Sequence, residues 1–118
     1  MNSPQYDHSQ PGLLLEIVGD DQEMFLQLAE IFVRESAEKF QNMRIAMAAS
    51  DFTQLGRQSH ALKGTVGPLG ADALVEELVK IEEECNASQF QRDDARLDAL
   101  EVELNQVKRE LQLFIANL

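Results

Sequence analysis

The chain has 118 residues, a formal net charge of −11 at pH 7 and one cysteine. A chain of this length suits one domain with a single hydrophobic core. The negative charge argues against binding to nucleic acid or to an anionic membrane surface, because both would repel it. No apolar run reaches the roughly 18 residues of a membrane span, and the first residues lack the pattern of a secretory leader. We therefore expect a cytoplasmic protein that binds neither nucleic acid nor membrane.

The histidines and the cysteine show no spacing typical of a metal site. His8 and His60 lie far apart in the sequence, and Cys85 falls on an apolar helical stripe, where we expect a small core residue. A single cysteine also leaves no internal disulfide. The sequence thus predicts neither a metal ion nor a cofactor bound by this chain.

The first ten residues, MNSPQYDHSQ, are polar and unpatterned. They predict a flexible tail (residues 1–10) ahead of a helical domain (residues 11–118). His8 belongs to this tail, and we assign it no role. Residues 13–18 can form a short helix that Gly19 closes.

A long second helix is expected to begin at the run Asp20-Asp21-Gln22-Glu23, where a capping residue is followed three places later by a glutamate. It should end near Ala49. Its apolar residues recur at helical spacing and are expected to be buried. They are Phe25, Leu28, Phe32, Phe40, Met43 and Met47.

The third helix is expected over residues 51–69, because Asp51-Phe52-Thr53-Gln54 repeats the capping pattern. Pro68 and Gly70 should end it, since proline cannot donate to the preceding turn and glycine readily adopts a left-handed cap. One face of this helix forms an apolar seam at alternating spacings of three and four. The seam consists of Phe52, Leu55, Ser59, Leu62, Val66 and Leu69.

Two more helices complete the chain, one over residues 71–86 and one from the connector at residues 86–91 to the C-terminus. The inward positions of the first are Leu74, Leu78, Ile81 and Cys85. The second keeps an unbroken heptad register of Leu97, Leu100, Leu104, Val107, Leu111, Phe114 and Leu118. Four amphipathic helices joined by short turns predict an all-α fold, an antiparallel four-helix bundle with a short extra N-terminal helix.

His60 lies on the face of the third helix that points away from the apolar seam. At about 100° per residue, Gly56, Gly64 and Gly67 fall within about 40° of it. A glycine inside a helix costs roughly 1 kcal/mol relative to alanine, so three of the chain's six glycines on one stripe need a reason. Space for another molecule to approach the imidazole is one such reason.

Two cations, Arg57 and Lys63, flank His60 on this strip in an otherwise acidic chain. A neutral imidazole is a capable nucleophile near neutral pH, because one ring nitrogen keeps a free lone pair. Lys63, one turn away, can hold an anionic group delivered to the ring. These features indicate a histidine that exchanges a phosphoryl group with another protein.

The run HALKGTVGPLGA, residues 60–71, resembles the signature of histidine phosphotransfer (HPt) domains of two-component phosphorelays. That signature is a histidine, then Leu-Lys-Gly, then small residues, then Leu-Gly-Ala. Thr65 and Val66 replace a commoner pair of small residues, and Pro68 stands where a polar residue is frequent. Neither departure removes a reacting group.

The resemblance implies that His60 accepts the phosphoryl group, that Lys63 lies beside that group and that Gly64 keeps the site open. Members of the family commonly carry Gln or Glu 22 residues after the histidine, which here is Glu82. A carboxylate that accepts the Nδ1–H would leave Nε2 as the nucleophile. Because two more glutamates follow directly, this assignment can slip by a residue.

The resemblance also implies the partners, which are receiver domains of response regulators or of a hybrid histidine kinase. A receiver aspartate would deliver the phosphoryl group with Mg²⁺ bound to the receiver, and a second receiver would take it over. The docking strip would comprise Gly56, Arg57, Gly64 and Gly67. We expect a monomer without autokinase activity, since the sequence has no Gly-rich phosphate loop and no room for a kinase domain.

Two alternatives stay open. In a non-catalytic helical adaptor, the last heptad helix would pair with a partner or with itself, which explains the bundle but not the glycines. The chain can also be the phosphoacceptor module of a hybrid sensor kinase, although the initial Met and the lack of a further domain favour a free-standing protein. The sequence does not identify the receivers, the direction of phosphate flow or the output.

Overall fold

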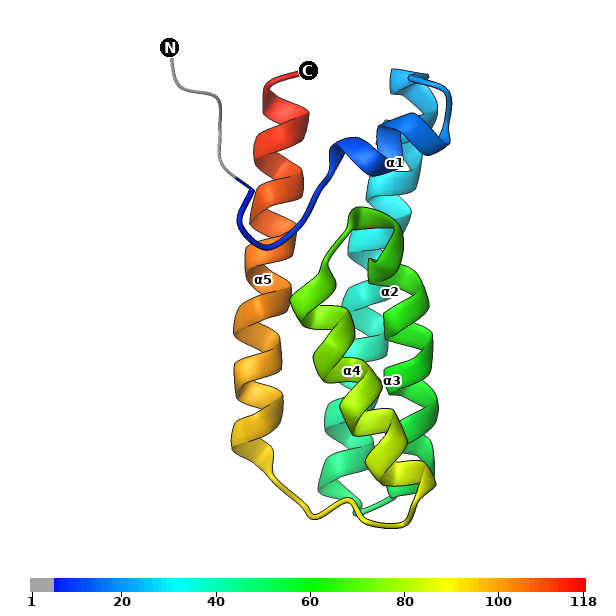
Figure 1. Ribbon diagram of the computed structural model, residues 1–118, viewed down its shortest axis with the longest axis vertical. Helices are drawn as coiled ribbons and strands as arrows, with labels where there is room; N and C mark the ends of the chain where they lie inside the picture. The colour runs from blue at the N-terminus through cyan, green and yellow to red at the C-terminus, as the bar shows by residue number, and fades with distance from the viewer. Residues whose placement is uncertain (1–5) are drawn as a thin grey trace.

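The computed structural model describes residues 6–118, most of which are helical and none of which form a strand (Figure 1). In chain order the elements are α1 (Gly12–Ile17), α2 (Gln22–Ala48), α3 (Phe52–Val66), the 3-10 helix η1 (Gly67–Leu69), α4 (Asp72–Asn86) and α5 (Asp94–Ala116). The helices α2 to α5 run alternately down and up the bundle, and α1 lies across its upper end (Figure 1). The predicted all-α, antiparallel four-helix bundle with an extra N-terminal helix is confirmed.

Aspartate side chains begin three of the four long helices. Asp21, Asp51 and Asp93 each accept a hydrogen bond from the backbone N–H three residues later. Such a cap satisfies one of the amide groups that a helix start leaves without a partner, and it is worth about 1 kcal/mol. The helix start predicted at Asp51 is therefore confirmed, and the start predicted in residues 20–23 is found there with Asp21 as the capping residue instead of Asp20.

The core consists of the apolar seams of the four long helices. Most of the predicted core residues are buried, whereas Leu28, Phe52, Cys85 and Phe114 are only partly buried. Leu118 is exposed, because α5 ends at Ala116 and the heptad register loses its last position. The other seam residues of α5 pack into the core of the bundle, where α5 contacts α2 and α4. This burial disfavours an adaptor that pairs through α5.

The third helix stops three residues before its predicted end. Gly67, Pro68 and Leu69 form η1, and Gly70 follows in the left-handed conformation with φ +64°. The N–H of Gly70 donates to the carbonyl of Gly67 at 2.9 Å. Proline and glycine thus end the helix in the way their backbone preferences predict, and the chain turns directly into α4.

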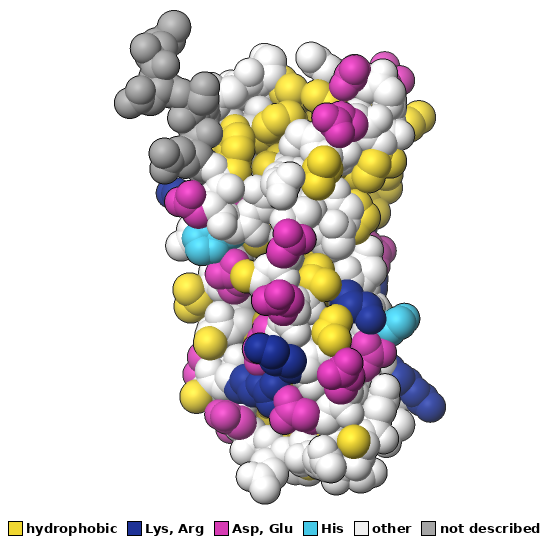
Figure 2. Space-filling model, viewed as in Figure 1, with side chains coloured by type: hydrophobic (Ala, Val, Ile, Leu, Met, Phe, Trp, Pro, Cys, Tyr) yellow, Lys and Arg dark blue, Asp and Glu magenta, His cyan; other side chains and the backbone are white. Residues whose placement is uncertain are grey.

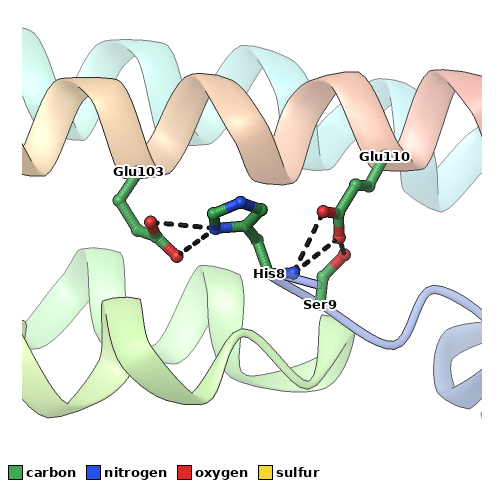
Figure 3. Close-up of polar contacts among 4 residues, drawn as sticks. All are labelled: His8, Ser9, Glu103 and Glu110. Atoms are coloured by element: carbon green, nitrogen blue, oxygen red, sulfur yellow. Dashed lines mark hydrogen bonds and ion pairs between the residues drawn. The ribbon is translucent and has the colours of Figure 1, made fainter. Parts of the chain in front are cut away.

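Residues 6–10, here called the N-terminal strap, lie against α5 and form hydrogen bonds with it (Figure 3). The Nδ1 atom of His8 lies 2.9 Å from Glu103, and the Oγ of Ser9 donates to Glu110 at 2.6 Å. The backbone N–H of His8 also donates to the carboxylate of Glu110, which is only 2% exposed. The strap therefore supplies the donors that a buried carboxylate needs.

The prediction of a flexible tail is wrong for residues 6–10, and the rest of the predicted tail lies outside the described residues. Besides its bonds to α5, the strap packs the ring of Tyr6 edge-on against Phe114. Its Gln10 N–H donates to the carbonyl of Leu69 at 2.7 Å, so the strap links α5 to the end of η1. Polar composition alone indicated mobility, but these polar groups have partners on helices distant in sequence.

Exposed apolar side chains gather on α1 and the first half of α2. They are Leu13, Ile17, Met24, Leu26, Ile31 and Val33. Figure 2 shows hydrophobic side chains at the upper end of the molecule, whereas charged side chains dominate its lower half. None of the helices formed by residues 6–118 is both long enough and apolar enough to cross a membrane.

Candidate functional site

His60 projects into solvent from the middle of α3. Its side chain is 66% exposed, whereas its neighbours Ser59 and Leu62 on the same helix are fully buried. This alternation follows from the helical period, because the residues of the apolar seam point inward and residue 60 points outward. The ring is open to a molecule that approaches from outside.

Glu82 on α4 holds one edge of this ring. Its Oε2 lies 2.7 Å from Nδ1 of His60, because α4 returns antiparallel along α3. A carboxylate can only accept, so in the neutral imidazole the proton sits on Nδ1 and the lone pair on Nε2. Of the three consecutive glutamates, Glu82 is the one that points toward the His60 ring, since Glu84 binds Arg96 and Glu83 is exposed.

Lys63 completes a small network with Glu82. Its Nζ donates to Oε1 of Glu82 at 3.0 Å, so the two oxygens of one carboxylate hold the lysine and the imidazole. Partial burial would by itself raise the pKa of Glu82. The hydrogen bonds from Lys63 and His60 outweigh that effect, and the pKa lies below its ordinary value. Glu82 is therefore a carboxylate at neutral pH.

The three glycines of the predicted strip do not share one environment. A Cβ placed on Gly64 or Gly67 would meet nothing within 4 Å, so both face open space next to His60. The prediction that Gly56 also lies on the open strip is wrong, because Gly56 is buried and a Cβ there would lie 3.0 Å from the Cβ of Cys85. Helical arithmetic describes one helix, and it does not show that α4 covers the first turns of α3.

Arg57 is exposed on the same side of α3, one turn before His60. It is the second cation near the ring, besides Lys63, which is paired with Glu82. Across residues 6–118, no group of three or more His, Cys, Asp or Glu side chains is arranged to hold a metal ion.

The chain matches the Hpt domain family over residues 27–110, which is most of its length and contains the whole site. The chain belongs to the Hpt family. Hpt domains are phosphocarriers that exchange phosphoryl groups with receiver domains in phosphorelays, so the protein is a histidine phosphotransfer protein.

A solved structure agrees with the fold of this Hpt domain. It is the histidine-containing phosphotransfer protein B (HptB) from Pseudomonas aeruginosa PAO1, to which the chain is 22% identical with a TM-score of 0.85. The alignment covers 97% of this chain and 99% of the HptB chain. No curated protein matches this Hpt domain.

Two features of the Hpt site do not follow from the sequence pattern. One is the ion pair of Lys63 with Glu82, because the spacing on α3 relates the lysine only to the incoming phosphoryl group. The other is the packing of Gly56 against Cys85 on α4. Both depend on the separation of two helices, and residue spacing within one helix contains no information on that separation.

Proposed function

We propose that His60 is the residue that carries the phosphoryl group. The observation that supports this most is that its side chain is 66% exposed while Glu82 occupies Nδ1, which leaves Nε2 as the nitrogen available for attack. The other histidine, His8, has its Nδ1 paired with Glu103 and belongs to the N-terminal strap. A receiver domain would load His60, and a second receiver would unload it.

The transfer proceeds by in-line attack of Nε2 on the phosphorus of a receiver aspartyl phosphate. The N–P bond forms while the bond from phosphorus to the aspartate oxygen breaks, and the aspartate leaves as a carboxylate with the electron pair. The proton stays on Nδ1, so the phosphorylated ring is an imidazolium. The Glu82 carboxylate stabilises this positive charge across the 2.7 Å contact.

Lys63 and Arg57 would neutralise charge on the incoming group. Lys63 Nζ lies 3.0 Å from Glu82, the residue that also binds the ring, and it would donate to an oxygen of the incoming phosphoryl group. Mg²⁺ belongs to the receiver in this proposal and supplies further charge neutralisation there. Gly64 and Gly67 leave room for the receiver loops, because neither presents a side chain.

The receiver would also contact apolar surface beyond the open glycines. A groove of about 220 Å³ lies where α2 approaches η1, and its lining includes Ile31, Thr65 and Pro68. Thr65 directly follows Gly64 in α3. An apolar residue of the receiver that enters this groove would add affinity without adding charge to an acidic protein.

The same proposal makes the chain a monomeric carrier in the cytoplasm that takes phosphate from receivers and not from ATP. The family supports the carrier role. Incubation of the purified chain with labelled ATP and Mg²⁺ should leave it unlabelled, and sedimentation should give the mass of one chain. Labelling by ATP alone would show autokinase activity and contradict this part of the proposal.

The central test is the uptake of label from a phosphorylated receiver. The wild-type chain should acquire label that is labile in acid and stable in alkali, as expected of a phosphohistidine. His60→Gln should abolish uptake with unchanged helical content by circular dichroism. His8→Gln is the matched control, because it removes the other histidine and should still accept label. Uptake by His60→Gln would refute the assignment.

A further inference from the structure

Gly56 lies under α4, one turn before His60 on α3. It is buried, and a Cβ at this position would lie 3.0 Å from the Cβ of Cys85 and 3.7 Å from Oδ1 of Asn86. Two Cβ atoms in ordinary contact are farther apart. Gly64 on the same helix would meet nothing within 4 Å, so of the two glycines inside α3 it is Gly56 whose missing side chain determines how close another helix lies.

The conflict at Gly56 could not be relieved by a side-chain rotation. Its nearest neighbour is the Cβ of Cys85, which is fixed to the backbone of α4, whereas the thiol lies 3.9 Å away. A side chain on residue 56 would therefore have to move one helix backbone relative to the other. Since α3 packs most extensively against α4, this displacement would act on the principal interface of the domain.

The same helix separation sets the contacts of Glu82. Cys85 follows Glu82 by one turn of α4, and Gly56 precedes His60 by one turn of α3, so the two contacts are adjacent along antiparallel helices. The bond from His60 to Glu82 is 2.7 Å long, and the bond from Lys63 to Glu82 is 3.0 Å long. Both cross from α3 to α4, so an increase in helix separation lengthens both together.

We propose that Gly56 is a positioning residue of the phosphotransfer site. Its missing side chain allows α4 to approach closely enough for the Glu82 carboxylate to fix the Nδ1–H tautomer of His60. The effect on transfer rests on the proposed function of His60. Gly56 itself contacts neither the ring nor the phosphoryl group.

The primary readout is the imidazole of His60, observed through its ¹⁵N chemical shifts by NMR. In the wild-type chain these should show one protonated Nδ1 and one bare Nε2. Gly56→Ala should mix in the other tautomer, and Gly56→Val should do so further because it demands more space. Transfer from a phosphorylated receiver should slow between about twofold and about tenfold, the range that corresponds to one hydrogen bond of ordinary strength.

Two further variants separate positioning from a loss of stability. Cys85→Gly removes the atom that a Cβ on residue 56 would meet, so Gly56→Ala combined with Cys85→Gly should recover the wild-type ¹⁵N pattern. Gly64→Ala is the matched control, because it adds the same methyl group to α3 in open space and should leave the tautomer unchanged. If Gly56→Val fails to fold, the comparison of Gly56→Ala with the double variant still tests whether Gly56 positions the ring.

The outcomes distinguish this inference from the proposed function. A folded Gly56→Ala and Gly56→Val pair with the wild-type tautomer and rate would overturn the inference. So would a double variant that regains stability without regaining the tautomer. Uptake of label by His60→Gln would instead overturn the proposed function and leave the ¹⁵N result for Gly56 intact.

Discussion

Oε2 of Glu82 and Nδ1 of His60 lie 2.7 Å apart across the interface of α3 and α4, although 22 residues separate them in the chain. The other oxygen of Glu82 holds Lys63, so the carboxylate is fixed from two sides. An imidazole bound in this way presents one free nitrogen to solvent. The reactivity of the site therefore depends on α4 as well as on the helix that carries the histidine.

Loss of the Glu82 carboxylate should slow phosphoryl transfer without abolishing it. We expect Glu82→Ala to reduce the rate about tenfold, because the ring loses its fixed tautomer and the imidazolium loses its counter-charge. Glu82→Gln should fall between wild type and Ala, since the amide oxygen can accept the Nδ1–H but carries no charge. Single-turnover transfer from a labelled receiver measures both.

The matched control for this prediction is Glu83→Ala. Glu83 is an exposed carboxylate on the same helix, so its removal changes the net charge equally without touching the ring. Its rate should stay within about twofold of wild type, the size of a small surface effect. Equal rates for Glu82→Ala and wild type would mean that the hydrogen bond has no role in transfer.

A large side chain at Gly64 should block transfer and leave the fold intact. The position faces open space beside His60, so Gly64→Leu adds bulk where the receiver must approach. We expect transfer to fall at least about tenfold, while helix stability rises because Leu is a better helix former by about 0.8 kcal/mol. Thermal unfolding and transfer rates measure the two effects separately.

For Gly64→Ala the change in helix stability should be similar, with a much smaller loss of transfer because a methyl group is short. Transfer by Gly64→Leu at the wild-type rate would show that the receiver does not come close to this turn of α3.

The sequence predicted this fold and much of its site because both depend on residue spacing along single helices. The seam of α3 defines an inward face, and the opposite face then has to carry His60. The family signature added Glu82, whose contact with the ring the structure displays. Gly56 was misplaced because its burial arises from α4, and the angle at which two helices cross depends on packing that no one-helix pattern encodes.

The N-terminal strap was missed for a related reason. The partners of its residues, Glu103 and Glu110, lie 95 and 102 residues away from His8, so no local pattern reveals them. One signal was present in the sequence. Glu110 stands beside Leu111 on the inward side of the predicted last helix, and a carboxylate near an apolar seam requires donors from elsewhere.

Removal of the hydroxyl of Ser9 should destabilise the protein although it lies far from His60. The hydroxyl donates to the buried Glu110 at 2.6 Å, and without it the carboxylate loses one of its few donors. We expect Ser9→Ala to lower the free energy of unfolding by about 1 to 3 kcal/mol, the usual cost for a buried group left short of a partner. Urea unfolding measures this change.

Ser36→Ala serves as its control. Ser36 is also fully buried, but its hydroxyl donates only to the carbonyl of Val33 in the same helix. Its loss should therefore cost less than the loss of Ser9. If the two variants unfold at the same urea concentration, the strap contributes nothing specific through Glu110.

The stability of the strap should decrease as the pH rises through neutrality. The hydrogen bond to Glu103 raises the pKa of His8 above its ordinary 6.5, burial opposes this, and the charges of Glu103, Glu110 and Asp7 add to the rise. A raised pKa in the folded state means that the folded protein binds the proton more tightly than the unfolded chain. The stabilisation is therefore complete below about pH 6.5 and is lost as the pH passes the folded pKa of His8.

The difference in the free energy of unfolding between wild type and His8→Gln isolates this contribution, because the other titrating groups are common to both proteins. Measured in urea between pH 6 and pH 8.5, this difference should shrink as the pH rises. In the background of Glu103→Gln it should shrink less, since the main cause of the raised pKa is gone. A difference that is constant or grows with pH would mean that His8 is not held by Glu103 in the folded protein, and that the strap is anchored by its other contacts, those of Tyr6, Ser9 and the backbone.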